Sequence, residues 1–277
     1  MPSLFVPGRL CLLGGMDEAA FQLVRTLSFL AAAAVALGLE RASPHARFRG
    51  SWRVNLGLWA LDLAVMSAAC GACACTVARW AAGQGIGVLN VAAAPAWVAV
   101  PVTVVALDLV SYGWHRANHT LAPLWRFHRV HHSDTTFTVS TALRFHPGEL
   151  LLSLPLRLGA VAALGAPAAA VVAFEALFTL ANLVEHGDID LPARLESGLA
   201  RVVVTPALHR RHHGIEPAQL GSNFGTVFTW WDKLLGTYGA SGSSVRVTIG
   251  LAATPAVGTV LGALALPLAS RAGRRPA

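Results

Sequence analysis

The chain has 277 residues, of which 55% are hydrophobic and 13% are charged, and its mean hydropathy is +0.56. These values lie outside the usual range of soluble domains and indicate an integral membrane protein. The net charge of +7 comes from arginines and a single lysine, Lys233. We expect no nucleic-acid partner, because the arginines flank apolar segments and form no basic surface interleaved with aromatic residues.

Four hydrophobic stretches are each about long enough to cross a bilayer core, which takes roughly 20 helical residues. They lie near residues 21–39, 54–78, 96–113 and 249–269. A further apolar run over 150–183 is interrupted by Gly165, Ala166 and Pro167, which predicts two shorter helices joined by a tight turn. Each half is slightly short for a full crossing, which is also consistent with a hairpin that enters the membrane without clearly leaving it.

The arginines predict how these spans are oriented, since cytoplasmic loops are enriched in basic residues. The loop after the first span carries several arginines, whereas the loop over 81–95 carries no charge. The third span then returns to the cytoplasm. If residues 249–269 crossed fully, Arg271, Arg274 and Arg275 would end outside against this rule, so that helix is also compatible with a position at the interface.

The expected fold is therefore an all-α integral membrane protein. It consists of a transmembrane helix bundle with a cytosolic helical cap that holds a histidine-rich dinuclear metal site. We expect membrane anchor helices over residues 1–95, a catalytic domain over 96–248, and a hydrophobic helix with a basic tail over 249–277. The histidine motifs are expected on the cytoplasmic side of a multi-pass protein.

Ten of the eleven histidines fall between positions 115 and 213, and most recur at helical spacing. WHRANH contains an HxxxH motif, and both FHRVHHSD and LHRRHHG contain HxxHH, whereas His45 stands alone in an arginine-rich loop. Residues three and four apart share one helix face, and neutral imidazole is the commonest metal ligand. Nine imidazoles exceed what one ion needs and predict two metals. These nine are His115, His119, His128, His131, His132, His186, His209, His212 and His213.

Two polar stripes lead toward these histidines from inside the membrane. Asp108 lies on the helix face of His115 and His119, where its carboxylate is placed to fix the tautomer of a ligand histidine. A polar contact at the membrane boundary explains Asp108 equally well. Glu175, Asn182 and His186 form a similar stripe on the second arm of the hairpin. Glu175 is the deepest of the three, and we expect it to support a ligand indirectly or through water and not to bind a metal itself.

The motifs WHRxxH, HRVHHS, RFHPGE, NLVEH and LHRRHH resemble those of the fatty acid hydroxylase superfamily, also called the sterol desaturase family. Its members are membrane-bound non-haem di-iron oxygenases. The resemblance covers about residues 100–240 and implies that the nine histidines are the metal ligands. Some relatives have HxxxH where this chain has Asn182 followed by His186, so Asn182 is expected to act through water. His146, in the RxHPxE segment, is expected beside the ligands and not among them.

By this resemblance the protein uses O₂ and two electrons to hydroxylate or desaturate a lipid-like substrate, with two iron ions as cofactor. The bilayer would supply the substrate, through a channel between the anchor helices and the 150–183 hairpin. No flavin, haem or nicotinamide motif is present, so a separate electron-donor protein or reductase is implied.

Two other interpretations of the histidines remain. A histidine-rich metal transporter would place its ligands at mid-membrane in broken helices, whereas most of these histidines lie in arginine-flanked segments. A zinc hydrolase would need only about three protein ligands, and the chain has no HExxH motif.

Overall fold

The computed structural model describes residues 18–47, 50–69, 74–239, 247–252 and 256–269. The secondary structure of the described residues is helical, apart from isolated β-bridges between extended segments. This confirms the prediction of an all-α protein. Cys70, Cys73 and the arginines at 271, 274 and 275 lie outside the described residues.

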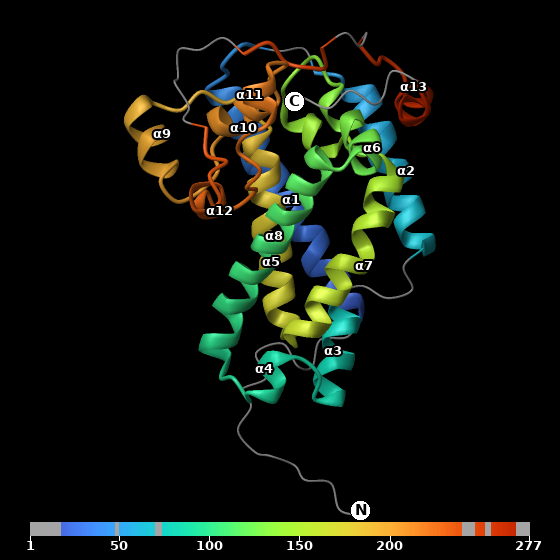
Figure 1. Ribbon diagram of the computed structural model, residues 1–277, viewed down its shortest axis with the longest axis vertical. Coiled ribbons are helices and arrows are strands. Elements are labelled where there is room, and N and C mark those ends of the chain that lie inside the picture. Colours follow the sequence, from blue (N-terminus) through green and yellow to red (C-terminus); the bar gives the residue numbers. More distant parts are fainter. Residues whose placement is uncertain (1–17, 48–49, 70–73, 240–246, 253–255, 270–277) are drawn as a thin grey trace, which may run out of the picture.

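Five long segments are apolar and long enough to cross a membrane. They contain α1 (Glu18–Ala42), α2 (Trp52–Ala69) with α3 (Ala74–Gln84) and the short α4 (Val88–Val91), α5 (Ala96–Thr120), α7 (Pro147–Leu164) and α8 (Ala168–Glu185). Figure 1 shows these helices side by side, with α3, α4 and the α7–α8 turn gathered at one end. The protein is thus a multi-pass membrane protein, and the segments around 21–39, 54–78 and 96–113 are confirmed as spans by length and composition.

The interrupted run over 150–183 forms an antiparallel hairpin. α7 ends at Gly165, whose φ of 67° is a left-handed conformation that glycine adopts without steric cost, and Pro167 begins α8. At this turn a Cβ on Gly87 would lie 2.1 Å from the backbone nitrogen of Gly165, so the α3–α4 connection packs directly on it. The turn lies level with the start of α5 (Figure 1), so the hairpin extends as far as that span.

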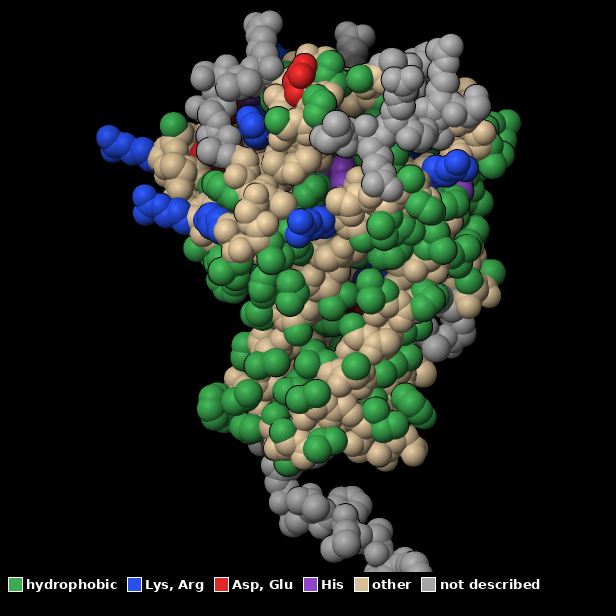
Figure 2. All heavy atoms as spheres, viewed as in Figure 1, with side chains coloured by type: hydrophobic (Ala, Val, Ile, Leu, Met, Phe, Trp, Pro, Cys, Tyr) green, Lys and Arg blue, Asp and Glu red, His purple; other side chains and the backbone are tan. Residues whose placement is uncertain are grey.

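Shorter elements cover the opposite end of the bundle and form the cap. They are α6 (Ala122–His132), the 3₁₀ helix η1 (Val139–Leu143), α9 (Ala193–Leu199), α10 (Pro206–His212), α11 (Pro217–Leu220), α12 (Trp230–Leu234), α13 (Val260–Ala265) and the 3₁₀ helix η2 (Leu266–Leu268). On the face shown in Figure 2, arginine and lysine side chains project from this end, while the other end shows hydrophobic side chains among backbone and uncharged side chains.

The expectation of one long helix over 249–269 is wrong. Within the described part of that stretch, α13 has six residues and is followed only by η2. Ala263 and Leu266 pack with Val54, Leu58 and Val130 of α2 and α6 in one buried apolar cluster. The hydrophobicity of this segment therefore serves packing on the cap and does not support a membrane crossing.

Buried polar side chains join the cap to α2. The Arg144 guanidinium is fully buried and donates to the Val130 carbonyl at 2.9 Å, the Val257 carbonyl at 3.0 Å and Asn55 Oδ1 at 2.9 Å. Asn55 Nδ2 in turn donates to Asp134 Oδ2 at 3.0 Å. One arginine thus ties together α6, α2 and the C-terminal segment.

Replacing Arg144 with methionine is expected to destabilise the cap, because each buried acceptor left unpaired costs about 1–3 kcal/mol. Thermal unfolding of the detergent-purified protein measures this loss. Arg126→Met is the control, because Arg126 is exposed on α6 and its loss should change stability by less than about 0.5 kcal/mol. Equal melting temperatures for both variants would contradict the role given to Arg144.

Candidate metal centre

Nine buried histidines from four segments meet where the cap joins the bundle. They come from α5, α6, the end of α8, and α10 with the residue that follows it. Their ring nitrogens form two groups, and within each group the nearest nitrogens lie within 4.8 Å of one another. The first group is His115, His119, His128, His132 and His212, and the second is His131, His186, His209 and His213. These are the nine residues singled out by spacing.

Each HxxHH motif is divided between the two groups. In α6, His128 and His132 belong to the first group, whereas His131 belongs to the second. In α10 the division is reversed, since His212 joins the first group and His209 and His213 the second. Residues i and i+4 nearly overlie one another, whereas residue i+3 is rotated by about 100° from i+4. The expectation that each motif presents its three histidines as one face is therefore wrong, because each helix lies between two sites.

The spacing of nitrogens in the second group is that of neighbouring ligands on one ion. His131 Nε2 lies 3.0 Å from His186 Nε2, which lies 2.9 Å from His209 Nε2, and His209 Nε2 lies 3.2 Å from His213 Nε2. Metal–imidazole bonds of about 2.0–2.1 Å place adjacent ligand nitrogens roughly 3 Å apart. The four rings therefore fit a single metal ion.

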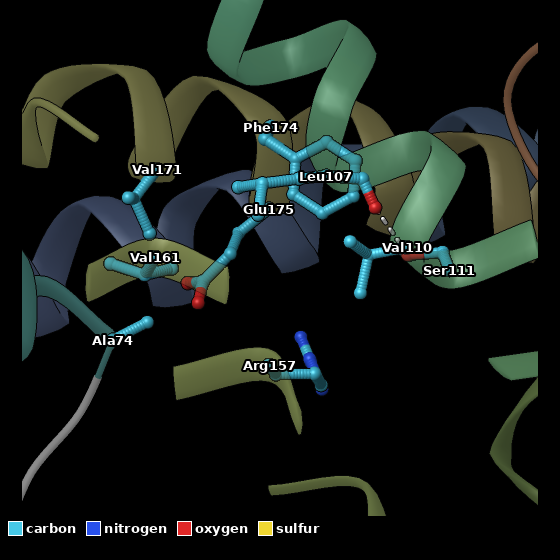
Figure 3. A pocket seen from close by; sticks show the side chains of 9 residues that line it. All are labelled: Ala74, Leu107, Val110, Ser111, Arg157, Val161, Val171, Phe174 and Glu175. Carbon is cyan, nitrogen blue, oxygen red and sulfur yellow. Dashed lines mark hydrogen bonds between the residues drawn. The ribbon is translucent and has the colours of Figure 1, made fainter. Parts of the chain in front are cut away.

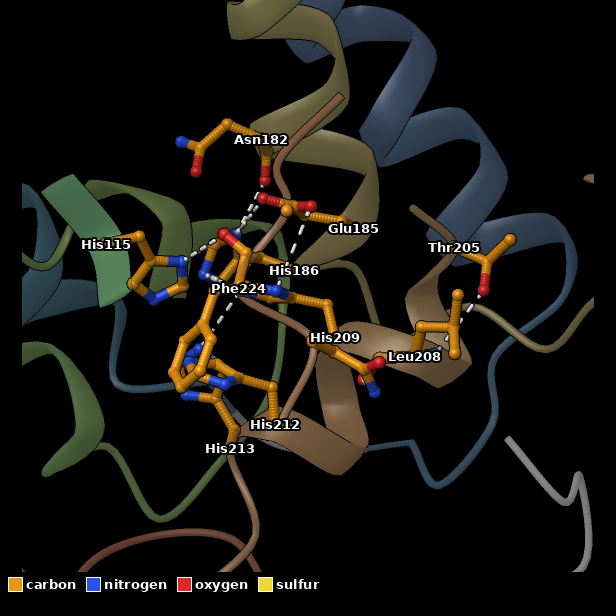
Figure 4. Close-up of polar contacts among 12 residues, drawn as sticks. His115, Asn182, Glu185, His186, Thr205, Leu208, His209, His212, His213 and Phe224 are labelled. Carbon is orange, nitrogen blue, oxygen red and sulfur yellow. Dashed lines mark hydrogen bonds and ion pairs between the residues drawn. The ribbon is translucent and has the colours of Figure 1, made fainter. Parts of the chain in front are cut away.

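Backbone carbonyls hold the opposite ring nitrogen of several of these histidines. Nδ1 of His115 lies 2.9 Å from the Phe224 carbonyl oxygen, Nδ1 of His186 lies 2.7 Å from that of Asn182, and Nδ1 of His212 lies 2.7 Å from that of Ser222. Figure 4 shows the first two of these contacts. A carbonyl can only accept, so Nδ1 carries the proton and Nε2 presents a lone pair.

The lone-pair nitrogens of the first group have no hydrogen-bond partner among the described residues. Nε2 of His115, of His128 and of His212, and both ring nitrogens of His119 and His132, are buried in this state. Buried polar atoms are normally paired, and unpaired ones cost free energy. One nitrogen from each of these five rings lies within 4.8 Å of the others, an arrangement that fits a bound metal cation.

Burial also favours the neutral form of six of these histidines. Removal from water lowers the pKa of His186 to about 4 and that of His212 to about 3. Burial and the neighbouring imidazoles hold the pKa of His131, His132, His209 and His213 well below their usual range. Neutral imidazole is the form that binds a metal ion.

Two buried glutamates beside the histidines were not singled out by the sequence. Glu149 Oε1, at the start of α7, lies 2.9 Å from His128 Nδ1 and accepts from Asn118 Nδ2 at 3.1 Å. Glu185 lies 3.9 Å from His186 Nδ1 and 3.8 Å from His209 Nδ1 (Figure 4). Their positions inside the RFHPGE and NLVEH motifs, beside histidines, were the sequence features that could have pointed to them. When ionised, their carboxylates can balance the charge of a cation held by neutral ligands.

Asp108 does not fix a histidine tautomer as expected. Its two oxygens accept from the backbone amides of Val227 and Phe228 at 3.2 Å each and from Trp231 Nε1 at 2.8 Å. The carboxylate therefore holds the loop before α12 against α5. The alternative of a polar contact describes Asp108 better, since the contact joins α5 to the cap.

Asn182 and His146 both lie next to the site without joining either histidine group. Asn182 contacts His186 through its backbone carbonyl, while its side chain donates to the Ala142 carbonyl at 3.3 Å. His146 caps α7, with Nδ1 accepting from the Gly148 amide at 2.9 Å, and its ring packs on Phe127. His146 thereby helps to begin the helix that carries Glu149.

Glu175 lies apart from the histidines, in a pocket between the membrane helices. Its carboxylate lies 3.1 Å from Arg25 Nε of α1. The expectation that Glu175 supports a ligand is wrong, because the helix rises by about 16 Å between Glu175 and His186 and the carboxylate is paired with α1 instead. The pocket is lined by Ala74, Leu107, Val110, Ser111, Arg157, Val161, Val171, Phe174 and Glu175 (Figure 3).

Residues 100–237 match the family model for fatty acid hydroxylase. The chain is 34% identical to the ornithine lipid hydroxylase OlsE of Rhizobium tropici over 59% of its own length and 48% of that protein. It is 31% identical to the alkylglycerol monooxygenase of Danio rerio, over 50% of the chain and 30% of the relative. It is 25% identical to the cholesterol 25-hydroxylase of Rattus norvegicus, over 54% of the chain and 50% of the relative.

The chain thus spans half or less of the length of these relatives. No solved structure matches it. The matched region contains all nine histidines of the two groups, both glutamates beside them and the α7–α8 hairpin. Through residues 100–237 the chain belongs to the fatty acid hydroxylase superfamily.

Proposed function

We propose that the protein is a membrane-bound, O₂-dependent hydroxylase of a lipid-like substrate, with one iron ion in each histidine group. The observation that carries this proposal is the convergence of nine buried imidazoles on two adjacent points. The relatives are named as hydroxylases or monooxygenases of ornithine lipid, alkylglycerol and cholesterol. The substrates in these three names are all amphiphilic lipids.

A pair of redox-active iron ions would supply the one-electron steps needed to activate O₂ and break an unactivated C–H bond. The overall reaction consumes one O₂, two electrons and two protons and yields an alcohol and water. The protein's own part is to orient the rings through carbonyls and Glu149, and to keep them neutral by burial. Glu149 and Glu185 are placed to offset the charge of the bound cations.

The pocket between α3, α5, α7 and α8 supports entry of the substrate from the bilayer. Most of its lining is apolar, and the pocket is partly open to the outside of the bundle. Ser111 of the pocket lies one turn before His115 on α5, a rise of about 6 Å. An apolar chain entering here would approach the metal centre along α5.

The arginine-rich end carries the histidines, so the positive-inside rule favours a site on the cytoplasmic side. A separate cytoplasmic electron donor would then reach the cap. The transporter interpretation finds less support, because the ligand rings are held in fixed tautomers at one end of the bundle and not at its middle.

Anaerobically purified protein loaded with ferrous iron is expected to bind about two irons per chain. With a chemical or protein reductant and isotopically labelled O₂, lipid extracts should gain product containing one labelled oxygen atom. A product with a new double bond and no added oxygen would instead assign desaturation. Full turnover with a single bound zinc would contradict the proposal.

Alanine at His212 or at His213 should abolish turnover, because each removes a ligand from a different group. Iron content should fall in both variants to about half or less, measured by elemental analysis. His45→Ala is the matched control, since His45 is half-buried beside Asp190 and distant from both groups in the chain. Wild-type turnover in His212→Ala or His213→Ala would refute the assignment of that group.

Glu149→Gln should lower iron affinity or turnover about 10–100-fold, the usual cost of losing a hydrogen bond that orients a ligand. The amide keeps the size of the side chain but removes the charge facing His128. Glu216→Gln, on the exposed surface of the cap, should leave both quantities unchanged. Equilibrium iron titration and turnover assays of the two variants make the comparison, and identical values for both would remove Glu149 from the ligand environment.

Val110→Trp should fill the pocket and lower kcat/KM for a long-chain substrate, while leaving iron content unchanged. Leu109→Trp is the matched control, because Leu109 is the preceding residue on α5 and is exposed at the bundle surface. Equal kinetics for the two variants would show that substrate does not pass through this pocket.

A further inference from the structure

The cap exposes an apolar surface formed by α9, α12 and the residues that follow each helix. No other described element covers this surface. Six large hydrophobic side chains there are more than one-third exposed, and Leu234 reaches 74%. The two helices form one surface, because Lys233 Nζ donates to the carbonyls of Ala200 at 3.1 Å and Arg201 at 2.7 Å. We call this surface the α9–α12 face; its apolar members are Leu195, Leu199, Val202, Trp230, Leu234 and Leu235.

Within the described residues, the exposed charges on the α9–α12 face are all positive. Arg194, Arg201 and Lys233 are exposed. The two acidic residues of these helices are buried and engaged, since Glu196 accepts from Thr205 Oγ1 and Asp232 accepts from the backbone amides of Phe224 and Gly225. Leucine and tryptophan beside cations are typical of a surface that meets anionic phospholipid.

The α9–α12 face reaches down to the level of the membrane-spanning helices. Trp231 Nε1 of α12 donates to Asp108 Oδ2, which is twelve residues beyond the start of α5 at Ala96. Twelve residues of helix rise about 18 Å, less than the roughly 30 Å of a hydrocarbon core, so this contact lies within the depth that α5 spans. In Figure 1, α12 lies beside the bundle helices and below the remainder of the cap. The exposed leucines therefore continue the surface that the spans present to lipid.

The same face is linked to the metal centre. Asp232 of α12 holds the Phe224 and Gly225 amides at 2.8 Å each, and the Phe224 carbonyl oxygen lies 2.9 Å from His115 Nδ1. The position of α12 thereby determines where this carbonyl meets a ligand ring.

We propose that the α9–α12 face is an interfacial anchor that binds anionic lipid. Trp230, Leu234 and Leu235 insert at the acyl boundary, and Arg194 and Arg201 contact the negatively charged headgroups. The anchor fixes α12, and with it the loop that orients His115, relative to the membrane. It is independent of which reaction the metal centre performs.

Cysteine accessibility in vesicles tests this anchor without any turnover. Leu234→Cys and, as a control, the exposed Glu216→Cys are placed in the full chain with its four native cysteines replaced by alanine. Both proteins are reconstituted in phosphatidylcholine vesicles with and without phosphatidylglycerol, and are labelled with a membrane-impermeant maleimide. Labelling of Glu216→Cys counts the outward-facing chains, and labelling in SDS confirms that both thiols react.

Leu234→Cys should react at least roughly tenfold more slowly than Glu216→Cys in vesicles that contain phosphatidylglycerol. Adding Arg194→Gln or Arg201→Gln should weaken this protection by about fivefold each, the effect of one basic residue at an anionic surface. Equal rates at the two positions would overturn the anchor. Protection that appears only when a soluble acidic electron-transfer protein is added would assign the face to that protein instead. Protection that ignores both phosphatidylglycerol and the arginines would overturn the headgroup contact.

Discussion

Nine imidazole rings share one buried space, and the rest of the structure provides what their neutrality and orientation require. A ring buried beside others cannot carry a second proton at low cost, so its nitrogens must be hydrogen-bonded or directed at a cation. Carbonyls of Phe224, Asn182 and Ser222 take one nitrogen each from three of the rings. The nitrogens left over converge on two points. Two bound metal cations would accept the lone pairs of these nitrogens. Glu149 and Glu185 are the nearby groups that can balance the added positive charge.

The membrane helices and the cap cooperate in building this space. The α7–α8 hairpin starts beside α6 with Glu149 and returns beside α10 with Glu185 and His186, so histidines far apart in the chain meet at one end. Arg144 fastens α6 to α2 and to the C-terminal segment. The loop before α12 is held on α5 by Asp108. The site is therefore assembled from α5, α6, α8 and α10, with supporting contacts from α2 and α7, and not from one compact unit.

Local sequence rules predicted the features that depend on helical period and apolar length. The spans, the break at Gly165 and the nine histidines all follow from spacing or composition. The division of each HxxHH between two groups needed the directions of α6 and α10 relative to each other, which one sequence does not contain. Likewise Asp108 shares a helix face with His115, yet its partners come from a loop over a hundred residues later. The stretch over 249–269 is apolar enough for a span but packs on α2 and α6 instead.

Anomalous X-ray diffraction at the iron absorption edge, on crystals of the iron-loaded protein, tests the central claim most directly. The account predicts two iron peaks, one among His115, His119, His128, His132 and His212 and the other among His131, His186, His209 and His213. A single peak, or peaks that respond at the zinc edge and not at the iron edge in the active protein, would contradict it.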